Sequence, residues 1–108
     1  MKRIALIEDD EFILDFVSKQ LDQAGYIVSI CVDGEKAVDH IASEKPDLIL
    51  LDLDLPHVNG RDILAELKAD ENLSSIPVVI FSNNNEPGLV EGLLKAGAAD
   101  YYMKASTE

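Results

Sequence analysis

Polar residues capable of chemistry stand at the ends of short apolar runs in this 108-residue chain. They comprise five acids, one hydroxyl and one amine: Glu8, Asp9, Asp10, Asp52, Asp54, Ser82 and Lys104. Carboxylates gathered in one place repel, and a pair ~5 Å apart costs about 3 kcal/mol at an effective dielectric of ~20. Such a cluster needs a cation, and oxygen ligands without His or Cys suit Mg²⁺ or Mn²⁺.

A metal ion, a lysine and a hydroxyl around one further carboxylate are the parts of a phosphoryl-transfer site. Positioning and charge neutralisation do most of the catalysis in that reaction. The nucleophile would be a carboxylate, and the product an acyl phosphate. Each part alone has a plainer explanation, because acids after a strand usually lie in solvated loops and a single Lys or Ser there is usually a turn residue. The joint spacing favours the site.

Short apolar runs predict the strands that position these residues. They cover residues 4–7, 26–32, 48–51, 77–81 and 101–103. Between them, apolar residues at helical spacing predict helices over 11–24, 35–44, a segment opening at Asn59-Gly60, and 86–96. Strict alternation of strand and helix predicts an α/β fold, a doubly wound parallel sheet with right-handed crossovers. Ligands bind such sheets at the carboxyl ends of the strands, where all these polar residues fall.

Four segments in this order and spacing resemble the signature of the response-regulator receiver family. They are IEDD at 7–10, LDLDLP at 51–56 followed by Gly60, FS at 81–82 and YYMK at 101–104. The resemblance extends from end to end of the chain. It implies that Asp52 is the phosphoacceptor. It also implies that Glu8 and Asp9 bind the metal with Asp52, and that the main-chain carbonyl of Asp54 is a further protein ligand.

The resemblance assigns the remaining roles as well. Ser82 matches the switch hydroxyl, Tyr101 the switch aromatic, and Lys104 the lysine that pairs with the phosphoryl group. The donor would be a phosphohistidine on a sensor histidine kinase or a histidine phosphotransfer protein, or a small donor such as acetyl phosphate. Phosphorylation would change the surface around the fourth helix and fifth strand, and so recruit a downstream protein or act on an effector domain.

The sequence departs from the family's pattern in three places. Ala105 follows Lys104 where the family usually has proline, often with a cis bond. A cis bond to another residue costs roughly 3 kcal/mol, so this peptide is either strained or trans with Lys104 re-aimed. Asn83 follows Ser82 where a small residue is usual, and we expect its side chain to narrow access to Asp52. The chain also stops at Glu108, before the family's fifth helix.

The missing helix has a structural consequence. In a flavodoxin-like sheet of order 2-1-3-4-5, right-handed crossovers place the first helix on one face and the next three on the other. The element after Lys104 would return to the first helix's face. We therefore expect one side of the third, fourth and fifth strands to be bare. The 108-residue form is then either a truncated chain of reduced stability or one that self-associates through this face.

Composition sets further limits. The net charge of −12 repels phosphate backbones, so direct binding of nucleic acid is not expected. No apolar run approaches the ~20 residues that cross a bilayer. We expect Cys31 to be a buried, inert thiol and His40 and His57 to be surface residues without function. The chain is predicted to be one soluble, cytoplasmic receiver domain over residues 1–108, incomplete at its C-terminus.

Two other functions remain open. Asp52-Leu53-Asp54 also resembles the nucleophile motif of haloacid-dehalogenase-like phosphatases, but Pro56 stands where that family has Thr or Val. Turnover of p-nitrophenyl phosphate would support that enzyme, whereas a stop after one phosphoryl group would support a regulator that is not an enzyme. The second alternative is a pseudo-receiver, a protein-binding module never phosphorylated in the cell. Asn83 and Ala105 favour it, and the complete set of acids, Ser and Lys argues against it.

Overall fold

A computed structural model describes residues 2–84 and 86–104 of the chain. The strands are β1 Arg3–Ile7, β2 Ile27–Cys31, β3 Leu48–Asp52, β4 Val78–Ser82 and β5 Asp100–Met103. The α-helices are α1 Glu11–Gln23, α2 Ala37–Glu44, α3 Gly60–Ala69 and α4 Leu89–Lys95, with a short 3₁₀ turn, η1, at Gly34–Lys36. No helix in these described ranges is long and apolar enough to cross a membrane.

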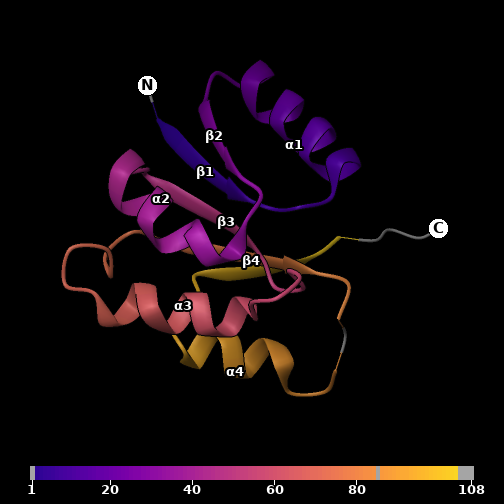
Figure 1. Cartoon of the computed structure of the whole chain (residues 1–108). Helices are drawn as coiled ribbons and strands as arrows, with labels where there is room; N and C mark the ends of the chain where they lie inside the picture. The colour runs from indigo at the N-terminus through magenta and orange to yellow at the C-terminus, as the bar shows by residue number, and fades with distance from the viewer. Residues whose placement is uncertain (1, 85, 105–108) are drawn as a thin grey trace.

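The five strands form one parallel sheet in the order β2-β1-β3-β4-β5. Figure 1 shows α1 on one side of this sheet and α2, α3 and α4 on the other. The predicted doubly wound fold and strand order are confirmed. Continuously apolar runs indicated the central strands correctly, because strands of a parallel sheet carry apolar side chains on both faces.

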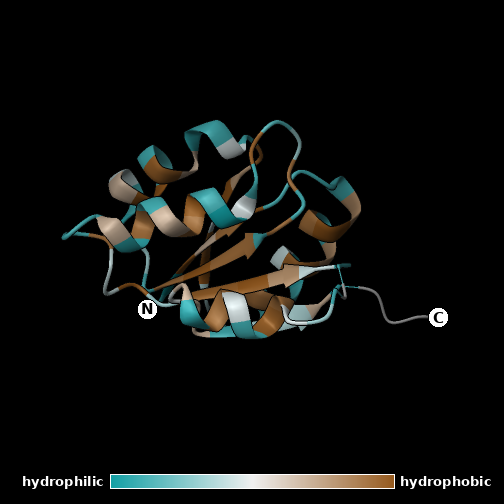
Figure 2. Ribbon diagram, turned by 90° about the horizontal axis from the view of Figure 1, so that it is seen from below, coloured by the Kyte–Doolittle hydropathy of each residue, from teal (hydrophilic) through white to brown (hydrophobic). Residues whose placement is uncertain are grey.

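The sheet face toward α2, α3 and α4 carries the core. Ile49 and Leu51 of β3, with Val78 and Ile80 of β4, are fully buried there. Figure 2 shows the strands as largely hydrophobic, whereas the helices alternate between hydrophobic and hydrophilic residues. This is the pattern of helices that bury one stripe against a sheet.

The opposite face is only partly covered. Leu50, Val79 and Phe81 are half-buried, and Tyr102 of β5 is 60% exposed. A groove of about 470 Å³ lies between these strands and α1, whose Phe12 and other apolar residues line its far side. No residue of α1 is fully buried. Among the described residues, the face over the third to fifth strands is therefore partly exposed rather than bare, since α1 covers some of it.

Two predicted helices differ from those observed. The segment 35–44 divides into η1 and α2. The predicted start of the fourth helix at residue 86 is wrong, since α4 begins at Leu89. Gly88 has a φ of +80°, which is left-handed and cannot continue a right-handed helix.

The side chain of Asp10 accepts hydrogen bonds from the N–H groups of Phe12 and Ile13, so it caps α1.

Candidate functional site

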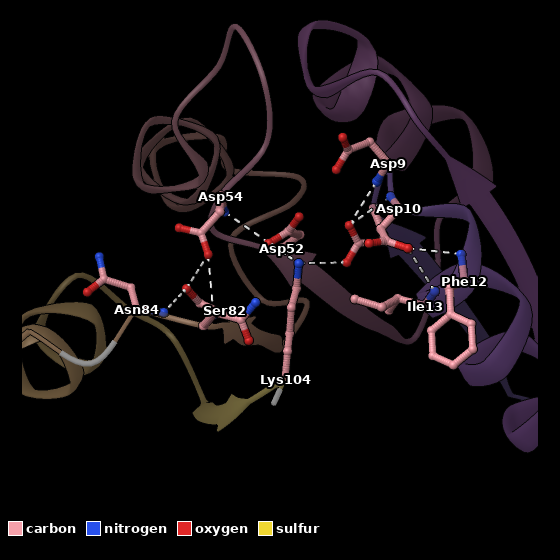
Figure 3. A network of polar contacts seen from close by, with 11 residues as sticks. Asp9, Asp10, Phe12, Ile13, Asp52, Asp54, Ser82, Asn84 and Lys104 are labelled. Atoms are coloured by element: carbon pink, nitrogen blue, oxygen red, sulfur yellow. Dashed lines mark hydrogen bonds and ion pairs between the residues drawn. The ribbon is translucent and has the colours of Figure 1, made fainter. Parts of the chain in front are cut away.

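Four strands deliver polar side chains to one end of the sheet (Figure 3). Glu8 follows β1, Asp52 ends β3, Ser82 ends β4 and Lys104 follows β5. Glu8 and Ser82 are 0% exposed and Asp52 is 1% exposed. Burial of two carboxylates and a hydroxyl at one point is costly unless they are paired, so their partners define the site.

Lys104 joins the two buried carboxylates. Its Nζ lies 2.9 Å from Asp52 Oδ1 and 3.0 Å from Glu8 Oε1, and 5.4 Å from the centre of the Phe81 ring. Burial acts to lower the pKa of Lys104, but the carboxylates of Asp52 and Glu8 outweigh it and raise that pKa above its usual value. Lys104 therefore stays charged at neutral pH. Four strand ends meet here as the sequence predicted.

Glu8 is held by main-chain donors as well. Its Oε2 accepts hydrogen bonds from the N–H groups of Asp9 at 3.0 Å and Asp10 at 3.1 Å. Burial, and next the neighbouring Asp52 carboxylate, raise the pKa of Glu8 to about 7, although the Asp10 N–H and Lys104 act in the opposite direction. A carboxyl group with this pKa is partly protonated at neutral pH. A nearby cation would favour its ionised form.

The carboxylates of Glu8, Asp9 and Asp52 fit a divalent metal. Each offers one oxygen, and these oxygens lie within 4.8 Å of one another. Asp52 Oδ2 is buried and has no hydrogen-bond partner among the described residues. A buried carboxylate oxygen without a donor is a costly arrangement that a cation would relieve. The donors are all oxygens, which suits Mg²⁺ or Mn²⁺.

Asp54 lies beside Asp52, and two of its contacts bear on the site. Its N–H donates to Asp52 Oδ1 at 2.9 Å, and its own Oδ2 accepts from the Ser82 hydroxyl at 2.5 Å. The second contact was not predicted, because only the main-chain carbonyl of Asp54 was assigned from the sequence. Whether that carbonyl is a metal ligand stays a prediction.

Asn84 connects Ser82 to Tyr101. The Asn84 N–H donates to Ser82 Oγ at 2.9 Å, and the Tyr101 hydroxyl donates to the Asn84 carbonyl oxygen. Sequence reasoning did not identify Asn84, and no signal was available. Its contacts to Ser82 and Tyr101 use main-chain atoms, which every residue type except proline offers in full.

Gly60 allows the loop after β3 to pack closely against α3. Its N–H donates to the Leu53 carbonyl oxygen at 3.1 Å. A Cβ at this position would lie 2.7 Å from Leu53 Cα and 2.8 Å from the Asp52 carbonyl oxygen. Only glycine fits without moving the backbone that carries Asp52.

The remaining sequence predictions fall outside this cluster. Cys31 is buried, as expected, and His57 is exposed. His40 is half-buried rather than exposed, with Nε2 3.1 Å from Ser29 Oγ. Asn83 is exposed, and its N–H lies 3.3 Å from Asp54 Oδ2. The peptide bond between Lys104 and Ala105 lies outside the described residues.

Known proteins share this sequence pattern. The response regulator receiver domain family matches residues 4–108. The DNA-binding dual master transcriptional regulator RpaA of Synechocystis is 40% identical over 105 residues, which are 96% of this chain and 43% of that protein. The DNA-binding response regulator MtrA of Mycolicibacterium smegmatis is 34% identical over 103 residues, 95% of this chain and 44% of that protein. The chain thus spans less than half the length of these relatives.

Solved structures share the fold. The Mn²⁺-bound form of response regulator Rcp1 has a TM-score of 0.90 at 30% identity, over 99% of this chain and 84% of that chain. The phosphorylated cyanobacterial phytochrome response regulator RcpA has a TM-score of 0.89 at 31% identity, over 98% of this chain and 82% of that chain. With a family match over residues 4–108, this chain belongs to the response regulator receiver domain family.

Proposed function

We propose that this receiver domain is a phosphoacceptor switch in which Asp52 accepts a phosphoryl group. The observation that carries the proposal is the buried Asp52 carboxylate, which is paired with Lys104 through one oxygen and has no hydrogen-bond partner at the other among the described residues. Asp52 is the last residue of β3, and ligands bind parallel sheets of this kind at the carboxyl ends of the strands.

The transfer itself needs little covalent chemistry from the protein. A bond forms between an oxygen of Asp52 and phosphorus, while the bond from phosphorus to the donor's imidazole nitrogen breaks and its electron pair returns to the imidazole. Lys104 lies within 3.0 Å of both buried carboxylates and neutralises part of the negative charge there. Lys104 can then pair with an oxygen of the bound phosphoryl group, as the family resemblance implies.

A divalent cation is the proposed cofactor. Glu8, Asp9 and Asp52 would hold Mg²⁺ or Mn²⁺, with the main-chain carbonyl of Asp54 as the further protein ligand. Such an ion would supply positive charge to the transferring phosphoryl oxygens. The solved structure of Rcp1 is described as Mn²⁺-bound, which supports a divalent metal as the cofactor.

The proposed partners are proteins. The donor is a sensor histidine kinase or a histidine phosphotransfer protein, and output passes to a downstream protein or to an effector domain through the surface of α4 and β5. RpaA and MtrA are described as DNA-binding, but this segment carries a net charge of −12 and is not proposed to contact DNA itself. A cytoplasmic location is proposed, in keeping with a lone buried Cys31.

Acetyl phosphate and intact-mass spectrometry test the proposal. With Mg²⁺, wild type should gain the mass of one phosphoryl group, whereas Asp52→Asn, or wild type with a chelator, should gain none. Glu44→Gln, a substitution on α2, is the matched control and should be phosphorylated like wild type. No gain in wild type would favour the pseudo-receiver, and continuous turnover of p-nitrophenyl phosphate would favour the phosphatase. Either result would contradict the proposal.

A further inference from the structure

We propose that the Asp54 carboxylate is a positioning group that holds the Ser82 hydroxyl, and through it Tyr101, in the unphosphorylated arrangement. The inference deepens the proposed function, since it takes Ser82 to respond to a phosphoryl group on Asp52. Asp54 thereby acts through Ser82 and not on the reacting atoms.

The contact between Asp54 and Ser82 is short, and it joins an exposed carboxylate to a buried hydroxyl. Ser82 Oγ donates to Asp54 Oδ2 at 2.5 Å, and Ser82 is 0% exposed. The N–H of Asn83 lies 3.3 Å from the same carboxylate oxygen. Hydrogen bonds to an ionised acceptor are shorter and about twice as strong as neutral ones, so this contact fixes the direction of the hydroxyl.

The same hydroxyl oxygen is tied to the following loop (Figure 3). It accepts the Asn84 N–H at 2.9 Å, and the Asn84 carbonyl accepts from the Tyr101 hydroxyl. The contacts form one continuous series from Asp54 through Ser82 and Asn84 to Tyr101. A change in where the Ser82 hydroxyl points is therefore transmitted to the aromatic ring on β5.

A serine hydroxyl has a single proton to donate. The Ser82 proton goes either to Asp54 or to an oxygen of a phosphoryl group on Asp52, but not to both. Phosphorylation must then break the Ser82–Asp54 hydrogen bond before the switch hydroxyl can engage. Removing the Asp54 acceptor should make the engaged state easier to reach, by about tenfold or more for the loss of a charge-assisted bond.

A simpler account also predicts tighter anion binding. Asp54 carries negative charge near the phosphoryl site, so neutralising it would help any anion to bind, whatever Ser82 does. The two accounts predict different effects on anion binding when Asp54 is replaced by asparagine and when it is replaced by alanine. Asparagine keeps a neutral acceptor and alanine keeps none, so the positioning role predicts a larger effect for Asp54→Ala than for Asp54→Asn. The charge account predicts equal effects.

The test combines two NMR measurements on the full chain. In the metal-free protein without any anion, Asp54→Ala should shift the Asn84 amide and the Tyr101 ring signals, and the control Asp39→Asn on α2 should not. In a titration with Mg²⁺ and beryllofluoride, Asp54→Ala should bind about tenfold or more tightly than wild type, and Asp54→Asn should lie between them. In a Ser82→Ala background both gains should vanish.

Unchanged Asn84 and Tyr101 signals in Asp54→Ala would overturn the inference. So would equal gains for the two Asp54 variants, or gains that persist in the Ser82→Ala background. Failure of the proposed function is recognised separately, because wild type would then bind no beryllofluoride. In that case the anion-free NMR comparison still decides whether Asp54 positions Ser82 and Tyr101.

Discussion

Glu8 and Asp52 are carboxylates buried side by side, and a single lysine lies between them. Lys104 is within 3.0 Å of both, but one positive charge cannot balance two negative ones. The pKa of Glu8 is raised to about 7, chiefly by burial and next by the Asp52 carboxylate, and Lys104 offsets this rise only in part. Without a metal, the site therefore carries uncompensated negative charge when Glu8 is ionised. The free energy of unfolding of the metal-free protein should depend on pH for this reason.

The sign of that dependence follows from the direction of the shift. Glu8 in the unfolded chain loses its proton near pH 4.5, whereas folded Glu8 keeps it until about pH 7. Between these values the folded state holds more protons, so the contribution of Glu8 to the free energy of unfolding falls as pH rises. In the chelated protein, wild type should therefore lose stability relative to Glu8→Gln between pH 4.5 and 7.

Urea unfolding of both proteins with a chelator, at several pH values in this window, measures the difference. Saturating Mg²⁺ should reduce the pH-dependent loss in wild type, since a bound cation favours ionised Glu8. If the free energy of unfolding changed with pH in the same way in wild type and Glu8→Gln, the raised pKa of Glu8 would be contradicted.

The sequence predicted which polar residues lie together, because the carboxyl ends of the strands in a parallel sheet meet at one edge. The sequence did not separate Asp10 from its neighbours, although its side chain caps α1. An acidic residue directly before a helix can either cap the helix or face a ligand, and the local sequence is the same in both cases.

The hydrogen bond from Ser82 to Asp54 could not be predicted either. It links residues 28 positions apart in the sequence and depends on how two loops pack.

Gly60 and Gly92 have opposite roles at the scale of elements. Gly60 begins α3, and a Cβ there would lie 2.7 Å from Leu53 Cα. Gly92 lies within α4, and a Cβ there would meet nothing within 4 Å. The same methyl group therefore has no room at one helix and ample room at the other.

We predict that Gly60→Ala lowers the free energy of unfolding by about 1–3 kcal/mol, since the Asp52–Leu53 backbone must move. Gly92→Ala should raise it by about 0.5–1 kcal/mol, because alanine loses less backbone entropy in a helix. Chemical denaturation of the two variants against wild type checks both values. Changes of the same sign would contradict the packing described for these helices.

The elements themselves were largely predictable. Apolar runs located all five strands because both faces of the sheet are apolar. The start of α4 was missed by three residues, from Glu86 to Leu89, since apolar periodicity does not report the left-handed φ of Gly88. Such a backbone angle depends on the turn from β4 into the helix.

The exposed groove beside α1 is the main feature at the scale of the whole molecule. It is lined by apolar residues of α1, β3, β4 and β5, among them Phe16, which is 57% exposed. Contiguous apolar surfaces of this kind are rare on soluble monomers. The isolated 108-residue chain should therefore bind a hydrophobic dye and self-associate as its concentration rises.

Phe16→Ser should reduce dye fluorescence and self-association without a large loss of stability, because the side chain is already mostly exposed. Leu94→Ser on α4 is the matched control, since Leu94 is 45% exposed but lies outside the groove. Sedimentation velocity and dye titration provide the measurements. A chain that stays monomeric and binds no dye, or equal effects of the two substitutions, would contradict this prediction.

The central claim is that Asp52 accepts the phosphoryl group and that its modification reaches the rest of the switch. Amide NMR of the whole chain with Mg²⁺ and beryllofluoride tests it most directly. Wild type should show saturable shifts at Ser82, Tyr101 and Lys104, and Asp52→Asn should show none of them. The same shifts in Asp52→Asn at saturating Mg²⁺ and beryllofluoride would mean that the phosphoacceptor lies elsewhere.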